Sequence, residues 1–341
     1  MMMRRNRYFY SALAICGIFI PAMITHAQTI SRQPNMNKTG WSTHCFGRYL
    51  VDLPPQAVIR TAYKVWGDPI TYSLGKTPES LNSEIPKREG QLKAIQHKKL
   101  EGSLYVRRVS HQNGSVSLIS WKAPFSKELM WMESFLVATD PARVFHYEGD
   151  ISPDKQETAI SLADSLAKNI RSRADNEIPT GPGFCIDKGF IAGNDYRSES
   201  VQVGIRLPQH PNAFISFDAS TGAEEDRLLE RVDNFLTKAV SGPLAGLKVL
   251  RKRERNVGGI PAEEYATAAT GNGQRVYVFA WESQGKNKSL SEQNVSAGLR
   301  VLEQSVVSPQ TPYQPAFQSD DEALQLWDAI IESIRLRPGA A

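Results

Sequence analysis

The sequence lacks the short motifs that mark many enzymes and nucleotide-binding proteins. It contains no Gly-x-Ser-x-Gly elbow, no His-Glu-x-x-His pair, no Gly-x-x-x-x-Gly-Lys loop and no dinucleotide fingerprint. Gly271-Asn272-Gly273 lies between two predicted strands, so we interpret it as a hairpin turn. We therefore assign no catalytic residue, no cofactor-binding residue and no metal ligand, and we predict that the protein is not an enzyme.

Cysteine and net charge are also scarce. The 341 residues include three cysteines, and the formal net charge is +4. Loss of residues 1–27 would leave only Cys45 and Cys185 and a charge near +1, because Arg4, Arg5 and Arg7 leave with that segment. A nearly neutral chain has no global field to hold nucleic acid or anionic lipid. Two cysteines without a nearby histidine pair do not make a tetrahedral zinc site.

The first 27 residues have the pattern of a signal peptide. Three arginines precede an apolar run over residues 8–24, and Thr25-His26-Ala27 offers small residues for a cut before Gln28. The run is too short and too interrupted for a stable membrane span. A lipoprotein cut before Cys16 is the alternative, although Ile15 is bulky for it. We predict a soluble periplasmic protein.

An oxidising compartment permits a disulfide between Cys45 and Cys185. Each residue opens a predicted strand at a corresponding place in its half of the chain. The pairing stays a hypothesis at this level, because Cα atoms more than about 7 Å apart cannot be bridged.

The pattern of apolar residues predicts an α+β fold built from two tandem, related domains. In each half a few strands, a helix, about four strands and a closing helix follow in order, which favours an antiparallel sheet with packed helices. Trp281 and Trp327 take inward positions. The expected parts are a leader at 28–44, an N-terminal domain at 45–174, a linker at 175–183 and a C-terminal domain at 184–338.

The expected elements follow hydrophobic periodicity. Helices are predicted over residues 81–100, 154–173 and 224–240, and from Asp320 with acids at its amino end. Single strands are predicted over 46–53, 130–138 and 184–192, among others.

The clusters of charge have ordinary structural interpretations. The basic run Arg251-Lys252-Arg253-Glu254-Arg255 lies in an alternating, strand-like stretch and is interpreted as a solvated face. The carboxylate pair Glu263-Glu264 is interpreted as a solvated edge, because adjacent strand residues rarely face one another as an acid/base pair.

One aromatic segment is a candidate for partner binding. Leu129, Met130, Trp131 and Met132 place large apolar side chains in sequence, and an exposed Trp/Met patch is typical of protein interfaces. The alternative is a strand that is buried on both faces.

Three segments resemble one family of proteins. The run Cys45-Phe46-Gly47-Arg48-Tyr49-Leu50-Val51-Asp52-Leu53-Pro54 is similar to the opening of type VI secretion phospholipase-immunity proteins. The run Phe184-Cys185-Ile186-Asp187 resembles the start of their second domain, and Leu326 to Pro338 resembles their closing helix. The likeness spans about residues 45–338.

The resemblance implies a periplasmic two-domain protein that protects its cell. Such proteins bind a lipase or phospholipase effector stoichiometrically and obstruct its substrate entrance. It implies a protein partner and no cofactor, nucleic acid or small-molecule substrate. Two other hypotheses remain open, namely an envelope hydrolase with an unrecognised carboxylate site and an envelope-binding module with exposed aromatics.

Overall fold

The structure, a computed structural model, describes residues 36–238 and 246–341. The predicted signal peptide, residues 28–35 of the leader and the expected helix end at Val240 lie outside these ranges. Within the described ranges, no helix is both long and apolar enough to cross a membrane.

Two series of elements follow one another in the same order. The first contains β1 (Ser42–Phe46), β2 (Tyr49–Leu53), β3 (Val58–Val65), β4 (Asp68–Tyr72), α1 (Pro78–Ala94), β5 (Tyr105–Ser110), β6 (Val116–Trp121), β7 (Met130–Ala138), β8 (Arg143–Ile151), α2 (Gln156–Asn169) and β9 (Ile170–Ser172). The second contains β10 (Gly183–Ile186), β11 (Gly189–Ala192), β12 (Glu199–Arg206), β13 (Ala213–Ser220), α3 (Leu228–Lys238), β14 (Lys248–Glu254), β15 (Glu263–Gly271), β16 (Gln274–Glu282), β17 (Asn294–Val301), α4 (Asp320–Ile331) and β18 (Arg335–Leu336). The α+β class and the repeated element order are confirmed.

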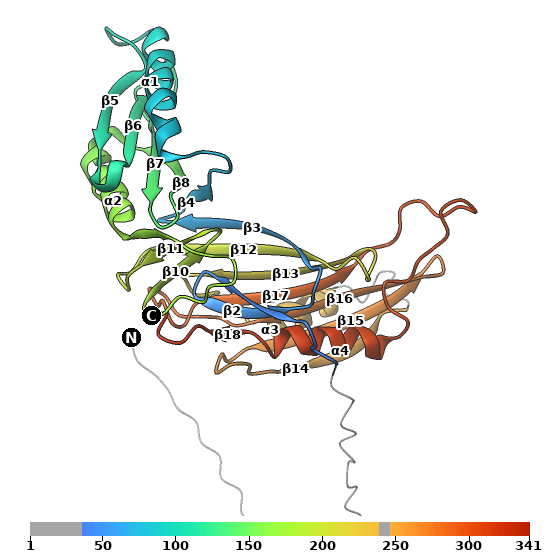
Figure 1. Ribbon diagram of the computed structural model, residues 1–341. Coiled ribbons are helices and arrows are strands. Elements are labelled where there is room, and N and C mark those ends of the chain that lie inside the picture. The colour runs from blue at the N-terminus through green and yellow to red at the C-terminus, as the bar shows by residue number, and fades with distance from the viewer. Residues whose placement is uncertain (1–35, 239–245) are drawn as a thin grey trace, which may run out of the picture. The chain divides into compact units, whose positions relative to one another are not determined.

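A single twelve-stranded antiparallel sheet runs through both halves (Figure 1). Its order is β14-β15-β16-β17-β13-β12-β3-β4-β8-β7-β6-β5, which is the same from either end when β12 is matched with β3. Those two central strands pair along eight residues, from Glu199 opposite Val65 to Arg206 opposite Val58. The sheets of the two halves are therefore joined edge to edge through β3 and β12.

The halves also exchange their closing strands. β18, from the end of the chain, pairs with β2, whereas β9, from the end of the first half, pairs with β11. Each three-stranded sheet therefore takes one strand from the other half of the chain. A disulfide between Cys45 and Cys185 links β1 to β10, with a Cα–Cα distance of 5.9 Å. These cross-connections tie the two halves together.

Two helices cover opposite faces of the first half's strands. Alternate residues of a strand point to opposite faces. Val137 packs with Leu81 and Ile85 of α1, whereas Leu136 packs in the larger core that also contains Leu166 of α2. Both faces are thereby buried, which explains the nearly continuous apolar run of β7.

In the second half, α4 covers one face of the sheet. Trp281 and Trp327 are fully buried, which confirms their predicted place in the core. The Trp327 ring meets Phe279 of β16 edge-on at 5.8 Å. Ser319 caps the helix by accepting a hydrogen bond from the Glu322 amide at 3.1 Å. The predicted start of this helix is correct.

Sequence periodicity misplaced several element boundaries. The expected strands at 46–53 and 184–192 are hairpins, because the chain reverses at Gly47 (φ +59°) and Lys188 (φ +58°). A side chain at position 47 would lie 2.9 Å from the Phe184 ring, so this turn requires glycine. The first helix begins at Pro78 because Thr77 caps it, and it ends at Ala94 rather than residue 100.

Candidate partner-binding surface

Buried arginines hold the junction between the two halves. Arg48 donates two hydrogen bonds to the Glu199 carboxylate, at 2.7 and 2.9 Å, and neither side chain is exposed. Arg337 donates to the carbonyls of Pro179, Gly181 and Gly183 at 2.7 to 2.8 Å. Burial, with Arg48 nearby, lowers the pKa of Arg337 to about 10, so it remains a cation at neutral pH. The segment predicted as a linker is therefore fixed by direct hydrogen bonds.

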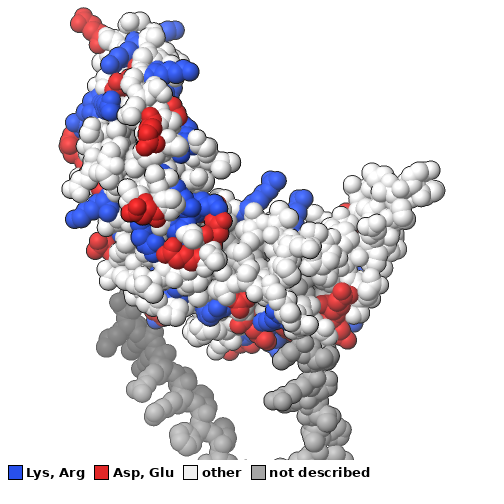
Figure 2. Space-filling model, viewed as in Figure 1, with Lys and Arg blue, Asp and Glu red and all other residues white. Residues whose placement is uncertain are grey.

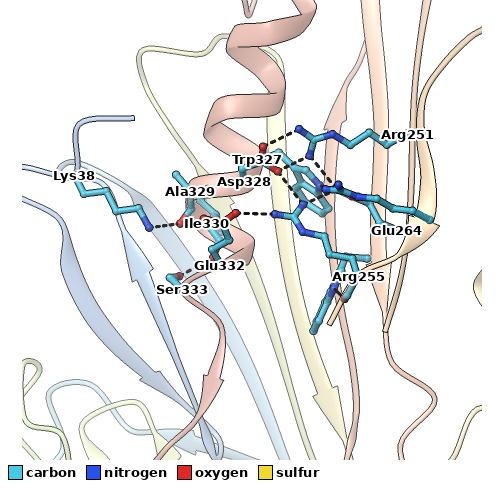
Figure 3. Close-up of polar contacts among 12 residues, drawn as sticks. Lys38, Arg251, Arg255, Glu264, Trp327, Asp328, Ala329, Ile330, Glu332 and Ser333 are labelled. Atoms are coloured by element: carbon cyan, nitrogen blue, oxygen red, sulfur yellow. Dashed lines mark hydrogen bonds and ion pairs between the residues drawn. The ribbon is translucent and has the colours of Figure 1, made fainter. Parts of the chain in front are cut away.

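A second ion network lies beneath α4 (Figure 3). Glu264 is fully buried and accepts hydrogen bonds from Trp327 Nε1 at 2.7 Å and from Arg255 at 2.6 Å. Asp328 accepts from Arg251 at 2.7 Å. Burial alone would raise the pKa of Glu264, but the neighbouring arginines and Trp327 hold it below its usual value. This network positions α4 against β14 and β15.

The two charge clusters of this region were misinterpreted from sequence. The alternation of the basic run is correct, but Arg251 and Arg255 face Glu264 and α4 rather than water. Glu263 and Glu264 are both buried instead of lying at a solvated edge. Sequence spacing could not show this, because the partners in α4 lie more than sixty residues away.

One group of side chains has the distances of a catalytic triad. His111 Nε2 lies 2.8 Å from Ser117 Oγ, and His111 Nδ1 lies 3.3 Å from Asp164 Oδ1. However, Ser117 is fully buried and its Oγ also bonds Ser134 Oγ at 2.7 Å. A nucleophile must reach its substrate. This serine cannot, so the arrangement is a structural hydrogen-bond network.

One cluster has ligand types suited to a metal. Atoms of Glu133, His146 and Glu148 lie within 4.8 Å of one another. The Arg88 guanidinium donates to Glu133 at 2.7 Å, so a cation already occupies one side of the group. The cluster therefore fits an ion-pair network of β7, β8 and α1 better than a metal centre.

The sheet face opposite α4 carries a groove at its outer end. It has a volume of about 780 Å³, and its lining includes Val58, Arg206, Phe214, Arg300 and Leu302. Phe214 lies directly opposite Arg300 in the sheet and is 39% exposed. Cavities of this size that combine apolar and charged linings are typical of binding sites.

A projecting loop stands beside this groove. The tip loop, residues 302–317, follows β17 and is orange-red at the upper right of Figure 1; the same end is almost free of charged residues in Figure 2. The sequence from Gln304 to Ser319 contains no charged residue. Val306 and Val307 are 62% and 51% exposed. Adjacent exposed valines in this uncharged run suit an apolar contact with another protein.

The side chain of Gln304 fixes the shape of the tip loop. Its Nε2 donates to the carbonyls of Val306, Thr311 and Pro312 at 2.9 to 3.3 Å, and its Oε1 accepts from the Gln314 amide at 3.2 Å. A loop that is ordered before binding loses less conformational entropy when it binds. Sequence periodicity missed this loop, although its lack of charge and its three prolines were visible signals.

The sequence-predicted binding segment is only partly accessible. Met130 and Met132 point into the core of the protein, because alternate residues of β7 face inward. Trp131 is half-buried beneath the Lys122 ammonium, which lies 5.5 Å from its ring centroid. Leu129 is 37% exposed. The expectation of a continuous four-residue patch is therefore corrected to Leu129 and part of Trp131.

Two family models match the chain. The N-terminal domain of Tle cognate immunity protein 4 matches residues 42–173, and the C-terminal domain of the same family matches residues 177–339. None of the curated proteins matches.

Solved structures show the same fold. An apo immunity protein TplEi of the type VI secretion system of Pseudomonas aeruginosa is 43% identical over 90% of this chain and 100% of its own, with a TM-score of 0.84. A chain of a Tle4–Tli4 complex is 44% identical over the same shares, with a TM-score of 0.85. TplEi complexed with an "L" peptide is 43% identical over 89% and 100%, with a TM-score of 0.79.

The fold, shared with solved immunity proteins at 43–44% identity, thus defines an immunity protein of the type VI secretion system. More specifically, the chain belongs to the family of Tle cognate immunity protein 4, because both domains of that family match in order along the same chain.

Proposed function

We propose that this protein is a periplasmic, non-catalytic inhibitor that binds a type VI secretion phospholipase effector and blocks its substrate entrance. The observation that carries the proposal is 44% identity over the full length of a chain solved in a Tle4–Tli4 complex. Export is supported by the signal-peptide pattern of residues 1–27.

An inhibitor of a lipase has to bind tightly, because one free enzyme molecule hydrolyses many lipids. We expect a dissociation constant of about 1 nM or below, equivalent to about −12 kcal/mol. Such affinity usually needs an interface of standard size with aromatic or arginine anchors. The junction that Arg48 and Arg337 hold in place supports tight binding, because a rigid protein loses little conformational entropy when it binds.

We assign the main contact to the groove and the tip loop, with Leu129 and Trp131 as a second contact. Replacement of Val306 and Val307 by Asp is expected to weaken binding of the lipase at least about tenfold, because it places charge in an apolar contact. Leu74→Asp is the matched control, since Leu74 is 87% exposed in the other half. Equal affinity of the tip variant and the wild type would remove the tip loop from the interface.

The compartment is tested in cells that direct the cognate lipase effector to their own periplasm. The full chain is expected to protect, whereas a chain that starts at Gln28 without a leader is not. Equal protection by the leaderless chain would contradict the periplasmic site of action. No protection by either, together with no complex on gel filtration, would contradict the binding itself.

A further inference from the structure

Two unpaired arginines flank an exposed aromatic ring in the groove. Phe214 of β13 lies opposite Arg300 of β17, and Arg206 extends β12 one residue beyond the pair Ile205–Ile215. Both arginines are exposed, and neither has an ion pair or side-chain hydrogen bond with any residue that the structure describes. Strands lie about 4.8 Å apart, so the two guanidinium side chains start roughly 10 Å from each other.

The same face extends this positive charge across β3. Arg60 lies opposite Gly204, and Lys64 lies opposite Ser200; both are exposed and unpaired within the described ranges. The acids nearby are Glu303, which also lines the groove, Asp218, whose pKa is raised by burial, and Asp68, which interacts electrostatically with Lys64.

The surplus of positive charge is local to this face of the sheet. Four of the forty Lys and Arg residues lie within residues 1–35, which contain no acid, so residues 36–341 hold 36 basic and 36 acidic residues. A neutral body with four unpaired cations on one open sheet face has an uneven field, which steers a partner of opposite charge.

We infer that this groove binds an acidic loop of the effector, with carboxylates on Arg206 and Arg300 and an apolar side chain on Phe214. The inference rests on the proposed function and adds the chemistry of the docking segment. Guanidinium groups pair with carboxylates through two parallel hydrogen bonds, which gives direction as well as charge. Val58 and Leu302 supply apolar walls around the pair. Gly204 leaves room for the Phe214 ring, because a side-chain carbon at position 204 would lie only 3.0 Å from that ring.

The first test measures association of the cognate lipase effector with the full mature chain. Arg206→Glu combined with Arg300→Glu is expected to slow association at least about tenfold in 50 mM NaCl, with a much smaller effect in 500 mM NaCl. Arg206→Gln with Arg300→Gln is expected to fall between this variant and the wild type. Arg108→Glu is the matched control, because Arg108 is exposed on the edge strand β5 and has no ion pair among the described residues.

Wild-type complex formation separates the two claims. If the wild type forms no complex, the proposed function fails. If the wild type binds and the variant with Arg206→Glu and Arg300→Glu associates at the wild-type rate, only the docking of an acidic loop in the groove is excluded. Slowing by the Arg108 variant to the same degree would also overturn the inference, because the effect would then follow net charge rather than the groove.

A carbodiimide cross-link identifies the partner's carboxylates directly. The reagent activates a carboxylate, and an amine then displaces the urea to form an amide bond. Lys64, and Lys in an Arg206→Lys variant, are expected to join Asp or Glu of one lipase loop, read by mass spectrometry. The inference would be overturned if position 206 formed no cross-links, or if its cross-links were scattered over many lipase segments. Binding of the protein to anionic vesicles without the lipase would also overturn it.

Discussion

Removal of the Cys45–Cys185 disulfide should cost a large part of the stability of the protein. The bond joins β1 to β10 and closes a loop of 140 residues. Backbone hydrogen bonds between Gly47 and Cys185, at 2.7 and 3.0 Å, keep the two strands together beside it. The folded state therefore retains most of its contacts without the bond, and the main effect falls on the unfolded chain.

The magnitude follows from the entropy of loop closure. For 140 residues the chain-entropy relation gives about 5 kcal/mol at 25 °C. We expect a measured loss of about 3 to 5 kcal/mol in Cys45→Ala with Cys185→Ala, and a steeper denaturant dependence because the unlinked unfolded chain exposes more surface. Each single variant breaks the same bond, so both should lose nearly as much as the double variant.

The assay is equilibrium unfolding in guanidinium chloride, followed by tryptophan fluorescence. Wild-type protein that was reduced in denaturant should unfold like the double variant. A double variant that unfolds at the wild-type denaturant concentration, or single variants that differ from it by several kcal/mol, would refute the reasoning.

Four further outcomes are expected. Residues 36–174 expressed alone should not fold cooperatively, because β2 loses its partner β18, whereas co-expression with 175–341 should restore folding by circular dichroism and gel filtration. Glu264→Gln should lower the free energy of unfolding by about 3 to 5 kcal/mol in urea, since buried arginines lose their anion. Folding lowers the pKa values of Glu264 and Asp328, so the stability that these carboxylates add is present above pH 4.5 and is lost as the pH falls through their folded pKa values. Thermal unfolding at pH 7 and pH 3 measures this loss. An unchanged melting temperature would contradict it. Ser117→Ala should destabilise by about 1 to 3 kcal/mol yet inhibit the lipase like wild type, whereas any lost hydrolytic activity would mean that Ser117 is catalytic.

Local patterns in the sequence predicted the class of fold and several elements well. The strand Met130–Ala138 and the start of α4 at Asp320 agree with the prediction. Both depend on local signals, namely strand propensity and a helix amino end with its cap and acidic residues. The symmetry of the large sheet and the exchange of β9 and β18 depend on pairing between distant segments, which periodicity does not report.

The candidate surface was harder to predict than the fold. Met130 and Met132 were selected for their size, but strand alternation turns them inward. The tip loop has no hydrophobic periodicity, so the sequence pattern did not predict it. Its fixed shape depends on hydrogen bonds between Gln304 and residues up to ten positions away. Arg206 and Arg300 are 94 positions apart in the chain, and only the sheet brings them to one groove.

The central claim, inhibition by stoichiometric binding, is tested most directly by titrating the cognate lipase effector with mature protein. Phospholipid hydrolysis is followed at a lipase concentration well above the expected 1 nM dissociation constant. The account predicts a linear fall of the rate to near zero at a fixed molar ratio, with a matching complex on gel filtration. Undiminished hydrolysis at a twofold molar excess, with no complex, would contradict it.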